Sequence, residues 1–171
     1  MLKESDMSLP KRGQVVAEGL YTKAQRERRD ATYWTTVQGV LAPLQFVVFL
    51  VSLALVLRFM LTGEGYWLAT VSIVVKTLVL YTIMITGAIW EKVVFGQYLL
   101  APAFFWEDVV SFLVIGLHTA YLYLLFNALV DQNTLMLTAL AAYFLYVINA
   151  AQFLLKLRMA RLEGTRELGH A

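Results

Sequence analysis

Four long apolar stretches, separated by short polar breaks, dominate the hydrophobic pattern of the chain. They run over about residues 37–61, 66–90, 103–129 and 134–157. Each is at least as long as the roughly 20 residues that a helix needs to cross the hydrocarbon core of a bilayer. A lipid-exposed backbone must satisfy its own hydrogen bonds, and the alternating pattern of a membrane β-barrel is missing. Each stretch is therefore predicted to be a transmembrane helix.

The breaks between these stretches are short, which favours antiparallel neighbours. Their sequences are TGEG at 62–65, EKVVFGQYLLAP at 91–102 and VDQN at 130–133. The pattern predicts an all-α fold, an integral membrane up-down bundle of four transmembrane helices. We expect a polar cytoplasmic segment at 1–35, the bundle at 36–158 and a cytoplasmic tail at 159–171. Within the first segment, LYTKAQRERRDATYW is predicted to form a short amphipathic helix at the interface.

Composition and charge agree with this prediction. Of the 171 residues, 60% are hydrophobic and 15% are charged, which is too apolar for an ordinary soluble domain. Lys and Arg gather near the two ends of the chain, whereas the two short turns carry Glu64 and Asp131. This distribution predicts that both termini are cytoplasmic. No cleavable signal peptide is expected at the start, lipid is an expected partner, and no basic face indicates nucleic-acid binding.

Several polar residues of the third stretch fall on one face of a helix. At about 100° per residue they lie within about 40° of one line. This face is formed by Glu107, Ser111, Val114, His118 and Tyr121. Asp108 points about 100° away and can address a different neighbour. Ionisable residues inside a span usually face the bundle interior, so this face is a candidate site.

Polar residues of the other stretches are expected to meet this face. Lys76 lies near mid-membrane, at the depth of His118, so a hydrogen bond between them is predicted. Glu91 lies about four turns later, near the cytoplasmic boundary. Polar seams are also predicted in the first and last stretches, at Gln38, Gln45, Ser52, Tyr146, Asn149, Gln152 and Lys156. The simplest interpretation of the seams is interhelical hydrogen bonding, and that of Glu91, Glu107 and Asp108 is a headgroup-level charge or an ion pair.

The residue types limit the chemistry. The chain has no cysteine, which excludes thiolate catalysis and Cys-ligated metals, and two histidines, one of them His170, do not indicate a bis-histidine haem site. General acid and base catalysis by carboxylates and a histidine remains, which suits the addition or loss of water. Nearby aromatic side chains are predicted to face inward and line a pocket for a large flat ligand; they are Tyr98, Phe104, Phe105 and Trp106.

Three long strings of the sequence resemble one family. They are RRDATYWTTVQGVLAPLQFVVFLVSLALVLRF, GAIWEKVVFGQYLLAPAFFWEDVVS and LHTAYLYLLF. In a chain of this length they closely resemble the 3-vinyl bacteriochlorophyllide hydratases of photosynthetic bacteria, called 2-vinyl hydratases under older ring numbering. The likeness covers about residues 21–162.

The resemblance implies an enzyme, a hydro-lyase of bacteriochlorophyll biosynthesis. It would add water to the C3 vinyl group of chlorophyllide a, or of a related bacteriochlorophyllide, to give a 1-hydroxyethyl group. It implies a multi-pass protein of the bacterial inner (intracytoplasmic) membrane. No cofactor is expected, since magnesium would be present only as part of the chlorin. Contacts with other copies of the chain, or with other enzymes of the pigment pathway, are open expectations.

Site roles are assigned from the residues alone, because the resemblance brings no established catalytic residue. Glu107 is the first choice as proton donor, with Asp108 or Glu91 holding the attacking water. Pigment binding is expected from His118, Ser111, Tyr121, Lys76 and Trp106. His118 has two alternative tasks, ligation of the chlorin magnesium or proton relay. Two rival functions are a non-catalytic chlorin carrier or assembly factor and, more distantly, a proton-coupled transporter.

Overall fold

A computed structural model of the chain describes residues 20–168, with the side chains of α5 described as far as Leu162. Its elements are α1 (Lys23–Ala31), α2 (Tyr33–Thr62), α3 (Tyr66–Phe95), α4 (Phe105–Phe126) and α5 (Gln132–Leu168). Within this described part every regular element is a helix. The predicted interfacial segment contains α1, a helix of 9 residues that opens with a capping box between Thr22 and Gln25.

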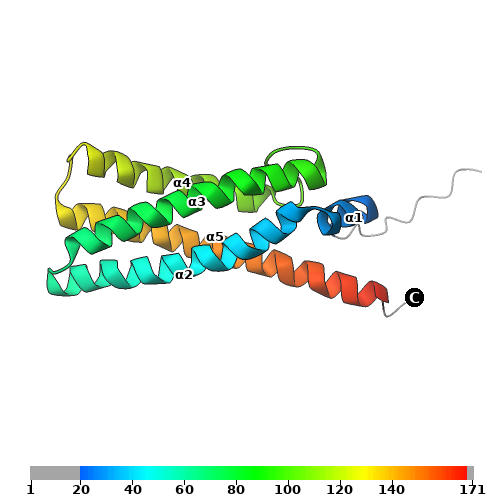
Figure 1. Ribbon diagram of the computed structural model, residues 1–171, viewed down its shortest axis with the longest axis horizontal. Coiled ribbons are helices and arrows are strands. Elements are labelled where there is room, and N and C mark those ends of the chain that lie inside the picture. The colour runs from blue at the N-terminus through cyan, green and yellow to red at the C-terminus, as the bar shows by residue number, and fades with distance from the viewer. Residues whose placement is uncertain (1–19, 169–171) are drawn as a thin grey trace, which may run out of the picture.

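Helices α2 to α5 form an up-down bundle, as predicted (Figure 1). All four are long and apolar enough to cross a membrane. The pairs α2–α3 and α4–α5 are hairpins, and their tight turns lie together at one end of the bundle (Figure 1). The loop between α3 and α4 lies at the opposite end, together with α1 and the end of α5 (Figure 1). The first span starts four residues earlier than predicted, and α3 continues five residues further, to Phe95.

The predicted segment limits at residues 35 and 158 stay predictions. Residues 1–19 and 169–171 lie outside the part that the structure describes. Within the described part, α5 continues unbroken past residue 158 to Leu168, so the last transmembrane helix and the start of the predicted tail are one helix.

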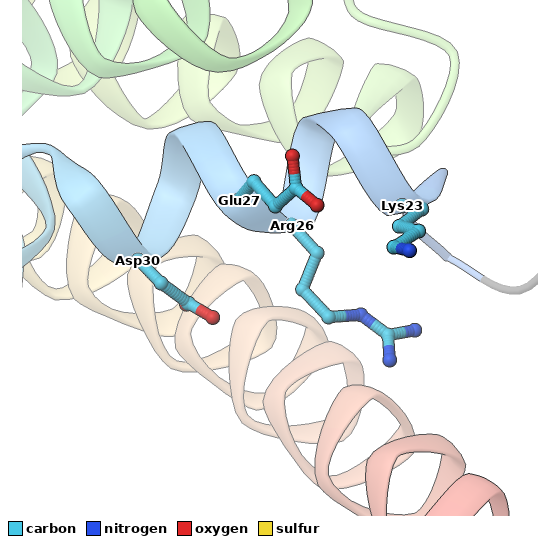
Figure 2. A pocket seen from close by; sticks show the side chains of 4 residues that line it. All are labelled: Lys23, Arg26, Glu27 and Asp30. Atoms are coloured by element: carbon cyan, nitrogen blue, oxygen red, sulfur yellow. The ribbon is translucent and has the colours of Figure 1, made fainter.

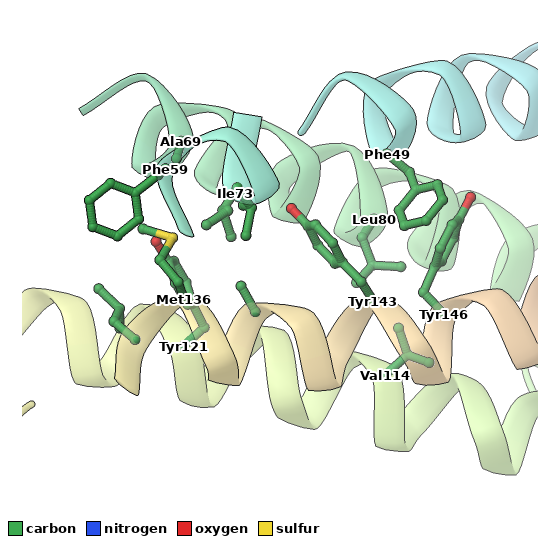
Figure 3. Packing of buried hydrophobic residues seen from close by; sticks show 13 residues of the cluster. Phe49, Phe59, Ala69, Ile73, Leu80, Val114, Tyr121, Met136, Tyr143 and Tyr146 are labelled. Atoms are coloured by element: carbon green, nitrogen blue, oxygen red, sulfur yellow. The ribbon is translucent and has the colours of Figure 1, made fainter. Parts of the chain in front are cut away.

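Polar contacts join the helices inside the bundle, as the seams predict. Ser52 of α2 lies 2.7 Å from the hydroxyl of Ser72 on α3 and 2.6 Å from that of Tyr143 on α5. Gln38 of α2 donates to Thr86 of α3 over 2.8 Å. Around these contacts the apolar core packs in layers along the bundle, with Phe49 of α2 facing Tyr146 of α5 (Figure 3). Such interhelical hydrogen bonds and close packing are the forces that associate helices within lipid.

Asp131 caps the start of α5. Its carboxylate accepts hydrogen bonds from the backbone N–H groups of Asn133 and Thr134 and from the Thr134 hydroxyl. These hydrogen bonds lower the pKa of Asp131 below its ordinary value of 3.8, because they favour the ionised form. The cap therefore stabilises the fold fully above that value, and its contribution is lost as the pH falls through the lowered pKa.

Asp131→Ala is expected to lower the melting temperature at neutral pH, because α5 loses its N-terminal acceptor. Asp131→Asn keeps an acceptor oxygen at the same position and is expected to recover most of the loss. Thermal unfolding of the detergent-solubilised protein measures both variants. The difference between the wild type and Asp131→Ala should shrink as the pH falls below about 4. A difference that stays constant down to strongly acidic pH would show that the ionised carboxylate is not the source.

Candidate functional site

The polar face predicted for the third span is buried in the bundle. The buried residues of α4 are Glu107, Asp108, Ser111, Val114, His118 and Tyr121. The five co-facial residues are thus confirmed as an inward face. Asp108 is buried as well, and it faces a different neighbour, α3, which carries Glu91 near its carboxyl end.

Glu91 and Asp108 form a carboxyl pair between α3 and α4. Their side chains interact directly, and the residues are only 5% and 3% exposed. The α3–α4 loop supplies one backbone donor to each: the N–H of Leu100 donates to Asp108 Oδ2 over 2.6 Å, and that of Ala101 to Glu91 Oε2 over 3.2 Å. Leu100 has a φ of 59°, a left-handed conformation that costs a leucine about 1–2 kcal/mol. The loop therefore keeps Leu100 in an unfavourable backbone conformation while its N–H groups donate to the carboxyl pair.

Glu107 lies beside this pair but contacts α5 instead. Its Oε1 is 3.6 Å from Nζ of Lys156, which also donates to the carbonyl of Ala103. Asn149 of α5 donates to the backbone carbonyl of Glu107 over 2.8 Å and accepts from Ser111 over 3.2 Å. Oε2 of Glu107 has no hydrogen-bond partner within the described part of the chain. One end of the bundle therefore brings together three buried carboxyl groups and one ammonium group.

The predicted hydrogen bond between the second and third spans is confirmed deeper in the bundle. Lys76 Nζ lies 3.0 Å from His118 Nε2, and Nδ1 of the same imidazole lies 2.7 Å from the carbonyl of Val114. A carbonyl only accepts, so Nδ1 carries the proton and Nε2 accepts from Lys76. Both imidazole nitrogens are then engaged, and the ring has no lone pair left for a metal. Lys76, which is 0% exposed, also lies 4.0 Å from the centre of the Tyr146 ring.

The remaining candidates divide between the interior and the surface. Ser111 and Tyr121 are buried on α4. Phe104 is buried among aromatic rings, as predicted. The prediction of an inward orientation is wrong for Tyr98, Phe105 and Trp106, which is 68% exposed. Trp106 precedes Glu107 by one residue, so the turn that buries Glu107 directs the tryptophan toward the outside of the bundle.

A surface hollow of about 460 Å³ lies beside α1, away from the predicted residues (Figure 2). It is lined by Lys23, Arg26, Glu27 and Asp30. This mixed set of charges suits water and lipid headgroups rather than a flat apolar ring system. Among the described side chains, which run from Leu20 to Leu162, no three Asp, Glu or His residues are grouped in a way that could hold a metal ion.

Two features of the site around the three buried carboxyl groups were not predicted. The backbone donors of Leu100 and Ala101 depend on the path of the loop, and its two sequence markers, Gly96 with a φ of 89° and Pro102, do not specify that path. Lys156 was assigned to the polar seam of the last span and to the positive end of the chain. A lysine in the same layer as an acid on the antiparallel neighbouring helix is the signal that indicates this ion pair.

Comparison with known proteins finds relatives that cover most of the chain. A family model described as 2-vinyl bacteriochlorophyllide hydratase matches residues 21–159. A 2-vinyl bacteriochlorophyllide hydratase of Rhodobacter capsulatus is 68% identical over 150 residues, which cover 88% of this chain and 87% of that protein. One of Cereibacter sphaeroides is 69% identical over 144 residues, covering 84% and 89%. No solved structure matches the chain. The chain belongs to the 2-vinyl bacteriochlorophyllide hydratase family.

Proposed function

We infer that this protein is a hydro-lyase that adds water to the vinyl group of a chlorophyllide or bacteriochlorophyllide in bacteriochlorophyll biosynthesis. The matching relatives have this activity in their names and cover most of the chain. The structural observation that supports the inference is the acid cluster, which we define as Glu91, Glu107, Asp108 and Lys156. Hydration of a vinyl group needs a proton donor on one carbon and a base for the incoming water.

The reaction sets two tasks for these residues. A proton added to the terminal vinyl carbon takes up the π electron pair and leaves positive charge on the carbon attached to the macrocycle. Water then forms a C–O bond at that carbon and gives up one proton. The chain therefore has to supply a proton, stabilise a cation and accept a proton, and the net change is the addition of one water molecule. No electron is transferred, so no redox cofactor is required, and we propose none.

We propose that the Glu91–Asp108 pair donates the proton. Two adjacent buried carboxyl groups repel each other when both are ionised, and one shared proton removes that repulsion. The N–H groups of Leu100 and Ala101 stabilise the negative charge that remains after the proton has left. This assignment differs from the prediction that Glu107 is the donor, because Glu107 contacts Lys156 of α5 at 3.6 Å, whereas Glu91 and Asp108 contact each other.

Glu107 is then the base. Its carboxyl group contacts Lys156 through Oε1, while Oε2 keeps a lone pair for the proton that the water releases. Asn149 and Ser111 fix the backbone and helix face from which Glu107 extends. The negative carboxylate also stabilises the cation that forms next to the macrocycle.

We propose that the pigment approaches from the lipid side, beside the α3–α4 loop. Tyr98 in this loop and Trp106 at the start of α4 are exposed aromatic side chains next to the acid cluster. Aromatic faces suit a flat macrocycle. Ser111 stays a candidate for positioning within the site. His118 and Lys76 hold each other deeper in the bundle, which supports a structural role for both instead of magnesium ligation.

The membrane topology is also a proposal. Lys23, Arg26, Arg28 and Arg29 precede the first span, and Lys156, Arg158 and Arg161 lie toward the end of the last, at the same end of the bundle as the acid cluster (Figure 1). This charge asymmetry supports cytoplasmic termini in the bacterial inner membrane. A reporter that is active only in the cytoplasm should then give a signal at either terminus. A reporter that is active only in the periplasm should give none. A periplasmic signal from both fusions would reverse the orientation.

The test of the function uses a host that lacks this pigment pathway. Membranes that contain the expressed protein are expected to convert a vinyl chlorophyllide into a product heavier by one water, seen by chromatography and mass spectrometry. Control membranes without the protein should give none. Folded protein that binds the pigment but forms no product with any vinyl chlorophyllide would favour the carrier. Pigment-independent proton flux into vesicles would favour the transporter.

A further inference from the structure

Several polar atoms buried in the bundle have no hydrogen-bond partner within the described part of the chain. Within the part of the chain that the structure describes, neither side-chain amide atom of Gln45 has a hydrogen-bond partner, and the residue is 3% exposed. Oε1 of Gln152 and Oε2 of Glu107 are also buried and unpartnered. Buried polar groups are almost always hydrogen-bonded, so each of these four atoms, which lie on three helices, calls for a partner.

The register of the helices brings these side chains to one level. Phe49 of α2 and Tyr146 of α5 pack with ring centres 4.8 Å apart and ring planes tilted by 48°, which aligns the two antiparallel helices (Figure 3). Gln45 lies one turn from Phe49 toward the acid cluster, and Gln152 lies under two turns from Tyr146 in the same direction. Side chains lean toward the N-terminus of their own helix, so along the bundle axis Gln45 leans toward the acid cluster and Gln152 leans in the opposite direction, toward the depth of Gln45.

Glu107 joins the same level from α4. Its backbone carbonyl accepts from Asn149, which is one turn before Gln152 on α5. Its side chain extends toward Lys156, which is one turn beyond Gln152. Glu107 therefore spans the stretch of α5 on which Gln152 lies.

Gln38 and Ser52 form the interhelical hydrogen bonds that are expected of residues in the polar seam of α2. Each lies seven residues from Gln45 on the inner side of α2, and each bonds to a side chain of α3. Gln45 lies between them without such a contact. The simple interpretation of Gln45 as an interhelical hydrogen-bonder therefore does not describe its surroundings.

We propose that Gln45, Gln152 and Glu107 line an internal water site that holds the reactant water of the hydration. The site offers one N–H donor group, from Gln45, and three acceptor oxygens. A pigment carbonyl only accepts and would leave all three oxygens without a donor. Water donates and accepts, so a small water cluster can satisfy the whole set.

The site would connect the interior of the bundle with the base. A water held by the Gln45 amide and by Glu107 Oε2 has a lone pair free to attack the cationic carbon, and its proton passes to Glu107. The C–O bond forms with that lone pair, so charge and atoms balance. This inference rests on the proposed function, and it adds Gln45 and Gln152 as residues that position the water.

The kinetic test uses the full chain in lipid nanodiscs, with pigment already bound. Gln45→Met keeps the size of the side chain and removes both polar atoms, and we expect it to lower the single-turnover hydration rate about tenfold or more, because the water is misplaced. Gln152→Met should act in the same direction. Pigment affinity should stay within about twofold, and dehydration of the hydroxyethyl product should slow by the same factor.

Gln38→Met is the matched control, because it removes the same amide from the same helix but at a site bonded to Thr86. It should lower the melting temperature and leave the single-turnover rate unchanged. The proposal is overturned if Gln45→Met keeps the wild-type rate and raises the melting temperature, as expected for removal of a dry unpartnered amide. It is also overturned if rate and pigment affinity fall together in Gln45→Met.

A second measurement separates this inference from the proposed function. A high-resolution experimental density map of the wild-type chain should contain ordered water within hydrogen-bond distance of the Gln45 amide. Absence of that density would overturn the water site even in an active hydratase. Its presence in a protein that converts no vinyl pigment would refute the proposed function and leave the internal water site standing.

Discussion

Glu91→Gln and Asp108→Asn are each expected to lower hydration turnover by about 10²- to 10⁴-fold, the usual contribution of a general acid. Each substitution keeps the shape of the side chain and removes one of the two groups that share the transferable proton. The amide also cannot reproduce the charge that the N–H groups of Leu100 and Ala101 stabilise. Pigment affinity should change little, because these groups act on the transition state rather than on the bound macrocycle.

The control for this prediction is Glu64→Gln. Glu64 lies in the turn at the opposite end of the bundle, where its exposed carboxylate is 3.7 Å from Arg58. This variant should retain wild-type turnover. Initial rates and pigment binding, measured on the same membranes, separate the two effects. If Glu91→Gln and Asp108→Asn both keep turnover within about twofold of the wild type, the carboxyl pair is not the proton donor.

The second large effect is a difference in stability between two substitutions in one buried pair. His118→Leu is expected to lower the free energy of unfolding by about 1–3 kcal/mol, because it leaves Nζ of Lys76 buried without its acceptor. Lys76→Met is expected to change it by less than about 1 kcal/mol, because an apolar side chain of similar volume removes the group that needs a partner. Unfolding in detergent, followed by circular dichroism, measures both variants.

The same two variants decide between the roles of His118. The imidazole lies about 16 Å along α4 from Glu107, and both of its nitrogens are already bonded. Hydration turnover and pigment affinity should therefore stay within a few-fold of the wild type in both variants. A folded His118→Leu protein that has lost pigment affinity would contradict this account and restore ligation of the chlorin magnesium.

The sequence predicted the bundle and the inward face of α4, because both depend on regular periodicity. Glu107, Ser111 and His118 repeat at helical spacing, so their common burial follows from the angle per residue. The depth of Lys76 and His118 follows from the length of each span. The angle per residue and the depth along a span both come from regular helix geometry. The structure confirms the common burial and the contact between Lys76 and His118.

The loop donors, the ion pair with Lys156 and the orientation of Trp106 do not follow from the periodicity of a helix, so they were not predicted. The loop from Gly96 to Phe104 directs two N–H groups at the carboxyl pair, and its path depends on the left-handed conformations of Gly96 and Leu100. The ion pair between Glu107 and Lys156 depends on the register between α4 and α5, which packing fixes. The outward orientation of Trp106 follows from the burial of its neighbour, and composition alone suggested the opposite.

The most direct test of hydration with proton donation by the carboxyl pair is the reaction in isotopically labelled water by the purified protein, compared with a Glu91→Gln, Asp108→Asn double variant. The wild type is expected to convert a vinyl chlorophyllide into a hydroxyethyl product that carries one labelled oxygen. The double variant should bind the same pigment and form at least about 10²-fold less product per unit time. Equal rates of labelled product from both proteins would contradict the assignment of proton donation to the carboxyl pair. Pigment binding by the wild type without any labelled product would contradict the hydratase itself.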